Sequence, residues 1–212
     1  MAELPILYSF RRCPFAMRAR MAIAISQRPV HLREVRLADK PDEMIALMDN
    51  PTVPLLLDRG RVVEESLQVM HWALAQNDPE NWLASADDPL IAQNDGPFKH
   101  DLDRYKYASR YDGIDPIAHR DGGVRHLHTL EERLGKAAFL TGAKRNFVDI
   151  ALFPFVRQFR IPDKNWFDAL PLPHLHQWLS TLTGSALFIS VMEKYPVWKD
   201  TGEAFVFPAP AP

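Results

Sequence analysis

The hydrophobic pattern of this chain changes once, at about Asn77. Before that point, short runs of β-branched and aromatic residues alternate with helical periodicity, and after it we find helical periodicity only. Alternating strands and helices fold into a sheet covered by helices, whereas successive helices pack on one another. We therefore predict an α/β domain over residues 1–77, a linker rich in turn-forming residues over 78–88, and an all-helical domain over 89–212.

The first part is expected to run strand, helix, strand, helix, strand, strand, helix. The ranges are 6–10, 15–27, 30–37, 41–48, 55–57 and 62–63, followed by a helix to about residue 76. Asp58-Arg-Gly60 predicts a hairpin turn between the last two strands. The second part predicts helices over 97–111, 124–135, 146–160 and 172–183. The proline-rich end, 207–212, is expected to be extended.

Charge and hydropathy exclude several classes of protein. The chain has 25 Lys and Arg residues and 27 Asp and Glu residues, so its formal net charge of −2 gives no basic excess for a phosphate backbone. No apolar run approaches the roughly 18–20 residues that cross a bilayer, and the first residues do not resemble a secretory signal. We expect a cytoplasmic protein with neither a nucleic-acid nor a membrane partner.

Cys13 is the single cysteine of the sequence, so any thiol chemistry depends on it. It lies between the first expected strand and helix, and Pro14 occupies the position where proline is tolerated at a helix start, which predicts Cys13 as the N-cap. Its sulfur is then expected to face unpaired N–H groups and the positive end of the helix dipole, near Arg11 and Arg12. Cysteines in such settings have pKa values of roughly 3.5–7.5 instead of about 8.5.

A lowered pKa of the Cys13 thiol mainly improves it as a leaving group, because nucleophilicity falls as the pKa falls. This favours thiol exchange with turnover over a trapped covalent adduct. The alternative, which the Cys-Pro pair alone leaves open, is that a lone cysteine is simply a small buried hydrophobe.

The segment Tyr8-Ser-Phe-Arg-Arg-Cys-Pro-Phe-Ala16, followed by a helix, resembles the amino end of cysteine-type glutathione S-transferases, the omega class in particular. The resemblance implies a thioredoxin-like, glutathione-binding domain, a helical acceptor-binding domain, a homodimer, and glutathione as co-substrate. It makes Cys13 the catalytic residue. Many glutaredoxins have a second cysteine in place of Ala16, so a monothiol mechanism resolved by free glutathione is implied.

Two further segments match this family in the same order. Val53-Pro54 precedes the third expected strand; the resemblance implies a cis peptide bond and a Val53 backbone that pairs with glutathione like an added strand. Ser66 is predicted to cap the next helix and receive an anion there, while Glu65 suits an ammonium group, and the γ-glutamyl end of glutathione carries both charges. Each motif alone has a structural explanation, as a strand-starting proline and a routine cap.

Other candidate contacts follow from the same resemblance. Phe15 is expected beside the tripeptide. Lys40 is a candidate for the glycyl carboxylate, because the family's longer Asn-Pro-x-Gly-x-Val-Pro loop is shortened here to residues 50–54. Tyr8 and Arg12 are candidate auxiliary residues; Tyr8 aligns with the tyrosine that activates glutathione in conjugating members, although packing is the preferred interpretation.

The helical part carries fewer signals. Asn146 and Asp149 resemble the buried capping box of the family, and we interpret them as structural. Tyr105, Tyr111 and Trp166 are candidates for an acceptor pocket, although aromatic residues at helical spacing more often belong to a core. Two His-x-His pairs, at 126–128 and 174–176, lie in or beside expected helices, where this spacing separates the rings, so we predict no metal site.

The primary prediction is a glutathione-dependent thiol transferase in which the Cys13 thiolate forms a mixed disulfide that a second glutathione releases. Two alternatives stay open. One is a conjugating transferase in which Tyr8 or Cys13 activates glutathione toward an electrophile. The other is a non-catalytic binding module that shares the fold.

Overall fold

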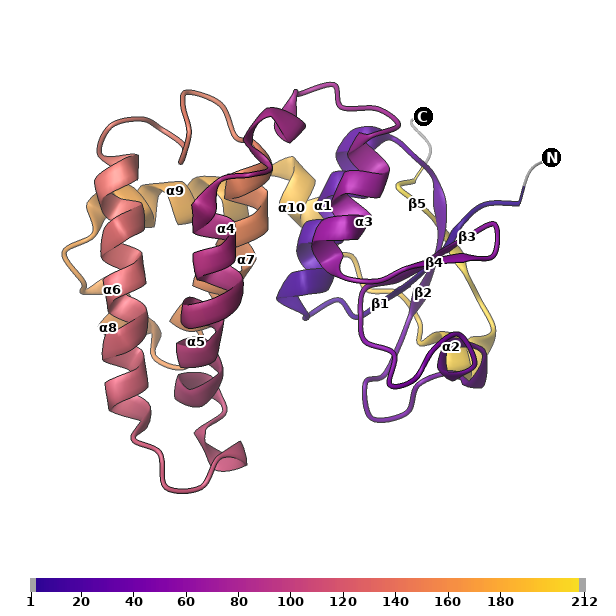
Figure 1. Ribbon diagram of the computed structural model, residues 1–212, viewed down its shortest axis with the longest axis horizontal. Helices are drawn as coiled ribbons and strands as arrows, with labels where there is room; N and C mark the ends of the chain where they lie inside the picture. Colours follow the sequence, from indigo (N-terminus) through magenta and orange to yellow (C-terminus); the bar gives the residue numbers. More distant parts are fainter. Residues whose placement is uncertain (1–2, 210–212) are drawn as a thin grey trace. The chain divides into compact units, whose positions relative to one another are not determined.

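The structure, a computed structural model, describes residues 3–209. Two compact units emerge from its contacts: unit 1 comprises Met1–Glu80 with Ala186–Pro212, and unit 2 comprises Asn81–Ser185. Figure 1 traces the chain through both units. The predicted change from alternating strands and helices to helices holds for residues 81–185, and its position near residue 77 lies close to the boundary at Glu80, but a further strand, β5, follows near the end of the chain.

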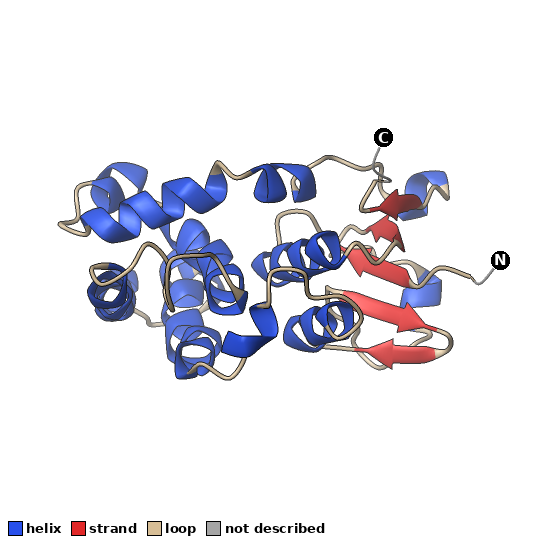
Figure 2. Cartoon of the chain, turned by 90° about the horizontal axis from the view of Figure 1, so that it is seen from above, coloured by secondary structure: helices blue, strands red, loops and turns tan. Residues whose placement is uncertain are grey.

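Unit 1 is built on a five-stranded mixed sheet in the order β4-β3-β1-β2-β5. Strands β1 and β2 are parallel, and the other pairs are antiparallel. Figure 2 shows these strands side by side, in red. The strands are β1 (Ile6–Ser9), β2 (Val30–Glu34), β3 (Leu55–Asp58), β4 (Arg61–Val63) and β5 (Phe205–Phe207).

The predicted hairpin joins β3 to β4. Arg59 and Gly60 both have positive φ, 50° and 81°, which is what a two-residue type I′ turn requires and what glycine adopts without strain. The register that follows pairs Asp58 with Arg61. The turn could therefore be predicted from the residues that form it.

The helices of unit 1 pack on the sheet. Tyr8 and Leu55 are paired across β1 and β3, and they join Met44 of α2 in a buried cluster. Leu7 and Leu56 are buried on the opposite face, because neighbouring residues of a strand alternate. The helices are α1 (Pro14–Ser26), α2 (Asp42–Ile45), α3 (Ser66–Leu74), α10 (Ala186–Val191) and α11 (Trp198–Thr201).

The regular elements of unit 2 are all helices, with one isolated β-bridge between Phe139 and Gly142. Its main helices are α4 (Pro89–Gln93), α5 (Lys99–Lys106), α6 (Pro116–Leu134), α7 (Phe147–Arg160), α8 (Lys164–Asp168) and α9 (Pro173–Thr183). Short 3-10 segments, η1 (Trp82–Ser85) and η3 (Ala108–Arg110), and a π-helical segment, η2 (Asn94–Phe98), complete it. None of the helices in the described part of the chain is both long and apolar enough to cross a membrane.

Two helices of unit 2 begin well before the predicted residue. The helix expected from residue 97 begins instead at Pro89 and passes through η2, where Pro97 lacks the N–H that an α-helical bond needs. Helix α6 begins at Pro116 rather than 124, because the Asp115 side chain caps it by accepting from Ile117 N at 2.9 Å.

The C-terminal segment corrects the prediction that the helical domain extends from 89 to 212. Residues from Ala186 onward belong to unit 1. Strand β5 pairs antiparallel with β2, and Phe207 is 2% exposed. A strand of three residues is too short to show a periodic pattern, so no strand could be predicted here. The expected extended end begins within this strand, and its last three residues, 210–212, lie outside the described part.

Candidate active site

Cys13 is placed where the chain turns from β1 into α1. Its N–H donates to the Phe10 carbonyl at 3.0 Å, and its carbonyl accepts from Met17 N at 2.9 Å as the helix begins. Cys13 is therefore the N-cap by position, as predicted, with Pro14 at the first helical position. Its side chain makes no capping hydrogen bond to the helix.

The sulfur of Cys13 instead lies against the segment before β3. Sγ is 3.7 Å from the Val53 carbonyl oxygen, to which the thiol donates. The Val53-Pro54 peptide bond is cis, as the resemblance implied. Cys13 and Phe10 also pack, partly buried, against the cluster that contains Val53 and Tyr8. Two residues that are 40 positions apart in the sequence thus meet at one point.

Glu65 and Ser66 form the start of α3. Glu65 is the N-cap and is exposed to solvent. Its φ is 55°, a value that L-residues rarely adopt. Ser66 is the first helical residue and is 1% exposed, so the prediction that Ser66 is the N-cap was wrong by one position. The reason is that the left-handed turn at Glu65, rather than a capping side chain, starts this helix.

Arg18 is a residue that the sequence analysis missed. It is 1% exposed, and its Nε donates to Ser66 Oγ at 2.9 Å, joining α1 to the start of α3. Its guanidinium also lies 5.1 Å from the centre of the Phe15 ring. A signal was present, because Arg18 and Arg20 interrupt the largely apolar sequence of α1, but the partner of Arg18 is 48 residues away.

The other candidate glutathione residues are less closely grouped. Phe15 lies on α1, two residues after Cys13, under the Arg18 guanidinium. Arg12 is exposed, with its guanidinium 5.3 Å from the centre of the Phe10 ring. Lys40 lies between β2 and α2, where its carbonyl accepts from Lys199 at 3.4 Å. No described contact brings Lys40 to the residues around Cys13.

Tyr8 is buried, at 1% exposure, in the strand next to β2. Its hydroxyl accepts from Arg33 Nη1 at 2.9 Å, and Arg33 is its register partner across the two strands. Burial raises the pKa of the Tyr8 hydroxyl, which Arg33 opposes. This placement favours the packing interpretation of Tyr8.

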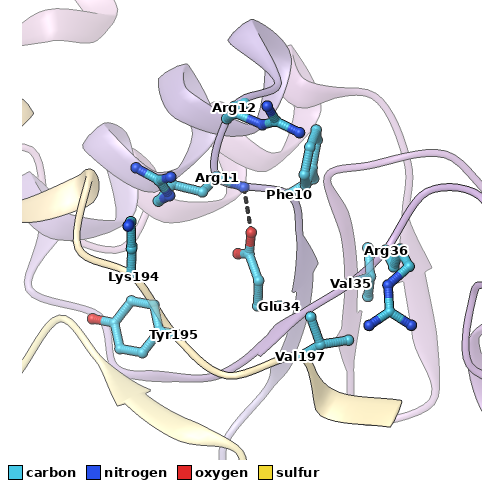
Figure 3. A pocket seen from close by; sticks show the side chains of 9 residues that line it. All are labelled: Phe10, Arg11, Arg12, Glu34, Val35, Arg36, Lys194, Tyr195 and Val197. Atoms are coloured by element: carbon cyan, nitrogen blue, oxygen red, sulfur yellow. Dashed lines mark hydrogen bonds between the residues drawn. The ribbon is translucent and has the colours of Figure 1, made fainter. Parts of the chain in front are cut away.

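A pocket of about 340 Å³ adjoins the loop that leads to Cys13. Four cationic side chains line it, and one buried carboxylate, that of Glu34, accepts from Arg11 N at 2.6 Å (Figure 3). Burial raises the pKa of Glu34, against the positive charges of Arg20 and Arg11. An anionic group is the ligand that suits such a lining. The lining residues are Phe10, Arg11, Arg12, Glu34, Val35, Arg36, Lys194, Tyr195 and Val197.

Three of the nine residues that line this pocket come from a segment that the sequence did not place here. Arg11 and Arg12 were noted for their charge, but Lys194 and Tyr195 come from the C-terminal segment, which was assigned to the other domain. Lys194 follows the short helix α10, and nothing in the neighbouring sequence predicts that it lines a pocket. Only the return of the chain to unit 1 brings it here.

The aromatic candidates lie in unit 2. The rings of Tyr105 and Trp166 have centroids 6.2 Å apart, and both neighbour Phe159, which is fully buried. Burial raises the pKa of Tyr105. Tyr111 instead packs under the Arg104 guanidinium at 4.6 Å. The structure therefore brings together two of the three predicted acceptor residues.

Comparison with known proteins agrees with this arrangement. A family model described as "Glutathione S-transferase, N-terminal domain" matches residues 7–82, and one described as "Glutathione S-transferase, C-terminal domain" matches residues 88–180. Together they span most of both units. They confirm the predicted fold, with a thioredoxin-like part followed by a helical part.

Individual relatives carry two kinds of name. The probable glutathione S-transferase GSTU1 of Oryza sativa subsp. indica is 32% identical over 171 residues, which is 73% of this chain and 73% of that protein. Glutaredoxin 2 of Escherichia coli (strain K12) is 26% identical over 191 residues, 76% of this chain and 87% of that protein. The crystal structure of glutathione transferase Omega 3C from Trametes versicolor superposes with a TM-score of 0.74 at 16% identity, covering 93% of both chains.

Proposed function

The chain belongs to the glutathione S-transferase family, and from this premise we propose that it is a glutathione-dependent thiol transferase whose nucleophile is Cys13. One observation carries the proposal: the Cys13 sulfur lies 3.7 Å from the backbone of Val53, directly before a cis proline. A backbone carbonyl at that point suits the N–H of a cysteinyl residue in an extended peptide. Glutathione bound in this way brings its own sulfur to Cys13.

The start of α3 supports the other end of the tripeptide. The exposed Glu65 carboxylate suits the ammonium group of the γ-glutamyl residue, and the first turn of α3 offers backbone N–H groups to its carboxylate. The guanidinium of Arg18, bonded to Ser66, adds positive charge nearby. In the proposal, Phe15 packs beside the tripeptide and Lys40 is the candidate for its glycyl carboxylate.

The proposed reaction has two thiol-exchange steps. The Cys13 thiolate attacks the glutathione sulfur of a mixed disulfide; a sulfur–sulfur bond forms to Cys13, the original disulfide bond breaks, and the acceptor leaves as a thiolate that takes a proton from water. A second glutathione thiolate then attacks the bound glutathione sulfur, which releases Cys13 and glutathione disulfide.

The cationic pocket indicates the class of acceptor. It is lined by the residues that directly precede Cys13, and four of its side chains are positively charged. We therefore favour an anionic disulfide, such as a glutathionylated molecule, over a neutral apolar electrophile. The relatives named as glutathione S-transferases and as glutaredoxin 2 are compatible with either transfer chemistry.

Intact-mass measurement after incubation with glutathione disulfide tests the proposal. The chain is expected to gain one glutathionyl group and to lose it when reduced glutathione is added. Cys13→Ser removes both the adduct and the reduction of a mixed disulfide. Tyr8→Phe is the matched control: its hydroxyl is held by Arg33, so turnover is expected to persist. An unmodified mass with the wild-type chain rules the proposal out.

The same pair of variants separates the conjugating alternative. If Tyr8 activates glutathione toward an electrophile, Tyr8→Phe abolishes conjugation of 1-chloro-2,4-dinitrobenzene while Cys13→Ser leaves it intact. A non-catalytic module shows neither activity but is retained on immobilised glutathione. We further propose a cytoplasmic homodimer, and sedimentation equilibrium of the purified chain measures the oligomeric state.

A further inference from the structure

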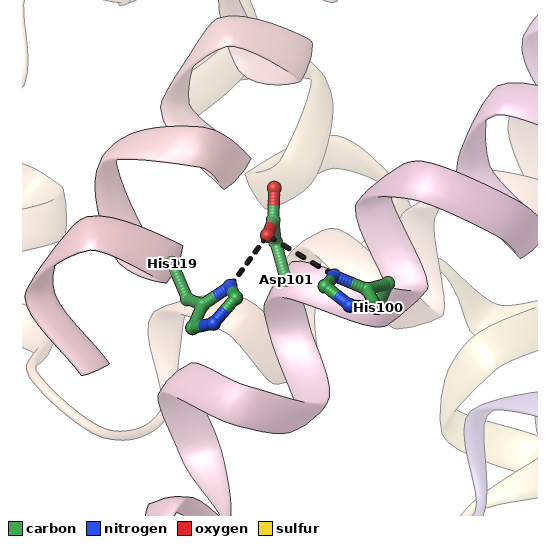
Figure 4. Close-up of side chains that lie close together, drawn as sticks. All are labelled: His100, Asp101 and His119. Atoms are coloured by element: carbon green, nitrogen blue, oxygen red, sulfur yellow. Dashed lines mark hydrogen bonds and ion pairs between the residues drawn. The ribbon is translucent and has the colours of Figure 1, made fainter. Parts of the chain in front are cut away.

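Two histidines and one aspartate converge in unit 2, and none of them takes part in the proposed reaction. His100 and Asp101 lie in the first turn of α5, and His119 lies in the first turn of α6 (Figure 4). One potential ligand atom from each lies within 4.8 Å of the others. The sequence contained no signal for this group, because His119 is 18 residues from Asp101 and neither histidine belongs to a His-x-His pair.

We propose that His100, Asp101 and His119 form a binding site for a divalent transition-metal ion, and for Zn²⁺ in particular. Both imidazoles direct Nδ1 to the same carboxylate oxygen: Asp101 Oδ1 is 2.7 Å from His119 and 3.4 Å from His100. Two ligands of a tetrahedral zinc ion with bonds of about 2.0–2.1 Å stand roughly 3.3 Å apart. Shifts of about an ångström therefore suffice to admit the ion.

The donor set favours zinc over calcium or magnesium. Two imidazole nitrogens and one carboxylate oxygen suit Zn²⁺ and its neighbours in the first transition series, whereas Ca²⁺ and Mg²⁺ prefer oxygen ligands. Three protein ligands leave a fourth position for water. His100 is the exposed member, with its side chain 53% accessible, so the ion can reach the site from solvent.

The backbone of α6 accommodates the Asp101 carboxylate. A Cβ at Gly122 would overlap that carboxylate, standing within 2.8 Å of its Cγ. Glycine inside a helix costs about 0.5–1 kcal/mol relative to alanine, yet α6 has glycine at this position. The glycine thus lets Asp101 stand between the two histidines, and Gly122 is a positioning residue for the site.

Cobalt(II) absorbance and zinc competition test the proposal. The experiment uses the full chain without a histidine tag, in a Cys13→Ser background so that the thiol does not compete for metal. One equivalent of Co²⁺ is expected to bind with visible d–d absorption and to be displaced by one equivalent of Zn²⁺. Binding without saturation at one equivalent overturns the proposal.

Matched variants assign the ion to these residues. His119→Ala and His100→Ala are each expected to weaken Zn²⁺ binding at least tenfold, whereas His128→Ala, an exposed histidine on the same helix, leaves it unchanged. His100→Ala remains informative if His119→Ala fails to fold, because the His100 side chain is half exposed. Equal affinity in all three variants overturns the assignment.

Gly122→Ala tests the site without changing any of the three proposed ligand side chains. The added methyl displaces the Asp101 carboxylate, so Zn²⁺ binding is expected to weaken, although alanine raises helix propensity and the metal-free unfolding temperature is expected to hold or rise. Unchanged zinc affinity in this variant contradicts the role of Asp101 as a ligand.

Discussion

Glu65 holds a backbone conformation that an L-residue rarely adopts, and it does so at the start of α3, where the candidate glutathione site lies. Such a conformation costs on the order of 1–3 kcal/mol and persists only where the surroundings enforce it. Here it directs the first turn of α3 and leaves the carboxylate exposed. The unusual backbone conformation and the proposed contact with glutathione thus fall on one residue.

Replacing Glu65 by glycine is expected to separate these two effects. Glycine adopts positive φ without strain, so stability is expected to stay level or to rise by about 1 kcal/mol, while retention on immobilised glutathione falls because the carboxylate is lost. Urea unfolding and resin retention measure the two quantities. Arg59→Gly, which relieves the same φ in the β3–β4 turn, is the control and is expected to keep retention. Full retention by Glu65→Gly contradicts a role in binding.

His126 makes stability depend on pH. Its ring stacks on Phe98 at 4.5 Å between centroids, and burial lowers its pKa from 6.5 to about 4. His126 therefore takes up a proton near pH 6.5 in the unfolded chain but only near pH 4 in the folded chain. Its contribution to the stability of the fold is present above pH 6.5 and is lost as the pH falls toward 4.

Between pH 7 and pH 5 we expect His126 to account for about 2 kcal/mol of lost stability. His126→Leu is expected to remove that part of the pH dependence, whereas His128→Leu, exposed on the same helix, retains it. Chemical denaturation at the two pH values gives the comparison. Parallel pH profiles for wild type and His126→Leu contradict the assignment.

At the scale of elements, helix α7 depends on its buried capping box. Asn146 Oδ1 accepts from Val148 N at 3.1 Å, and Asp149 accepts from Asn146 N at 3.0 Å, Leu140 N at 3.0 Å and Trp178 Nε1 at 2.8 Å. Asp149 is fully buried. The carboxylate therefore joins the start of α7 to the preceding loop and to α9.

Asp149→Ala is expected to cost at least about 3 kcal/mol, because it leaves several buried N–H donors unsatisfied. Asn146→Ala removes a single capping acceptor and is expected to cost about 1 kcal/mol. The order of the two, measured by thermal unfolding with circular dichroism, tests the role of Asp149. Equal losses indicate that Asp149 acts as a helix cap and nothing more.

Elements with local signals were the ones that the sequence predicted well. The Asp58-Arg-Gly60 hairpin and the Asn146–Asp149 capping box each depend on residues that are close together in the sequence, and the structure contains both. The Ser66 cap was misplaced because the deciding feature is a backbone angle that the sequence does not display. Arg18 was missed because its partner, Ser66, is remote in the chain.

At the scale of the whole molecule, the two units are not two successive lengths of chain. Unit 1 is completed by the segment after Ala186, whose strand β5 covers the edge of β2. Phe207 is buried in this strand, and its ring lies 5.6 Å from the Arg20 guanidinium. Val206, the neighbouring residue, is 40% exposed.

Phe207→Ala is expected to destabilise unit 1 by about 3–5 kcal/mol, whereas Val206→Ala on the same strand is expected to cost less than about 1 kcal/mol. Native-state hydrogen exchange distinguishes the units: amides of β2 are expected to exchange faster in Phe207→Ala, and those of α7 are expected to keep their protection. Equal protection of β2 in the two variants contradicts a stabilising role for β5.

The return of the chain to its first unit also has a consequence for synthesis. Residues 81–185 leave the ribosome before residues 205–207, so the helical unit is complete while the sheet still lacks its last strand. The nascent sheet then presents the open backbone of β2, the kind of edge that pairs with foreign strands. Translation pauses or stops within the codons for residues 186–205 are therefore expected to yield aggregation-prone chains rather than functional fragments.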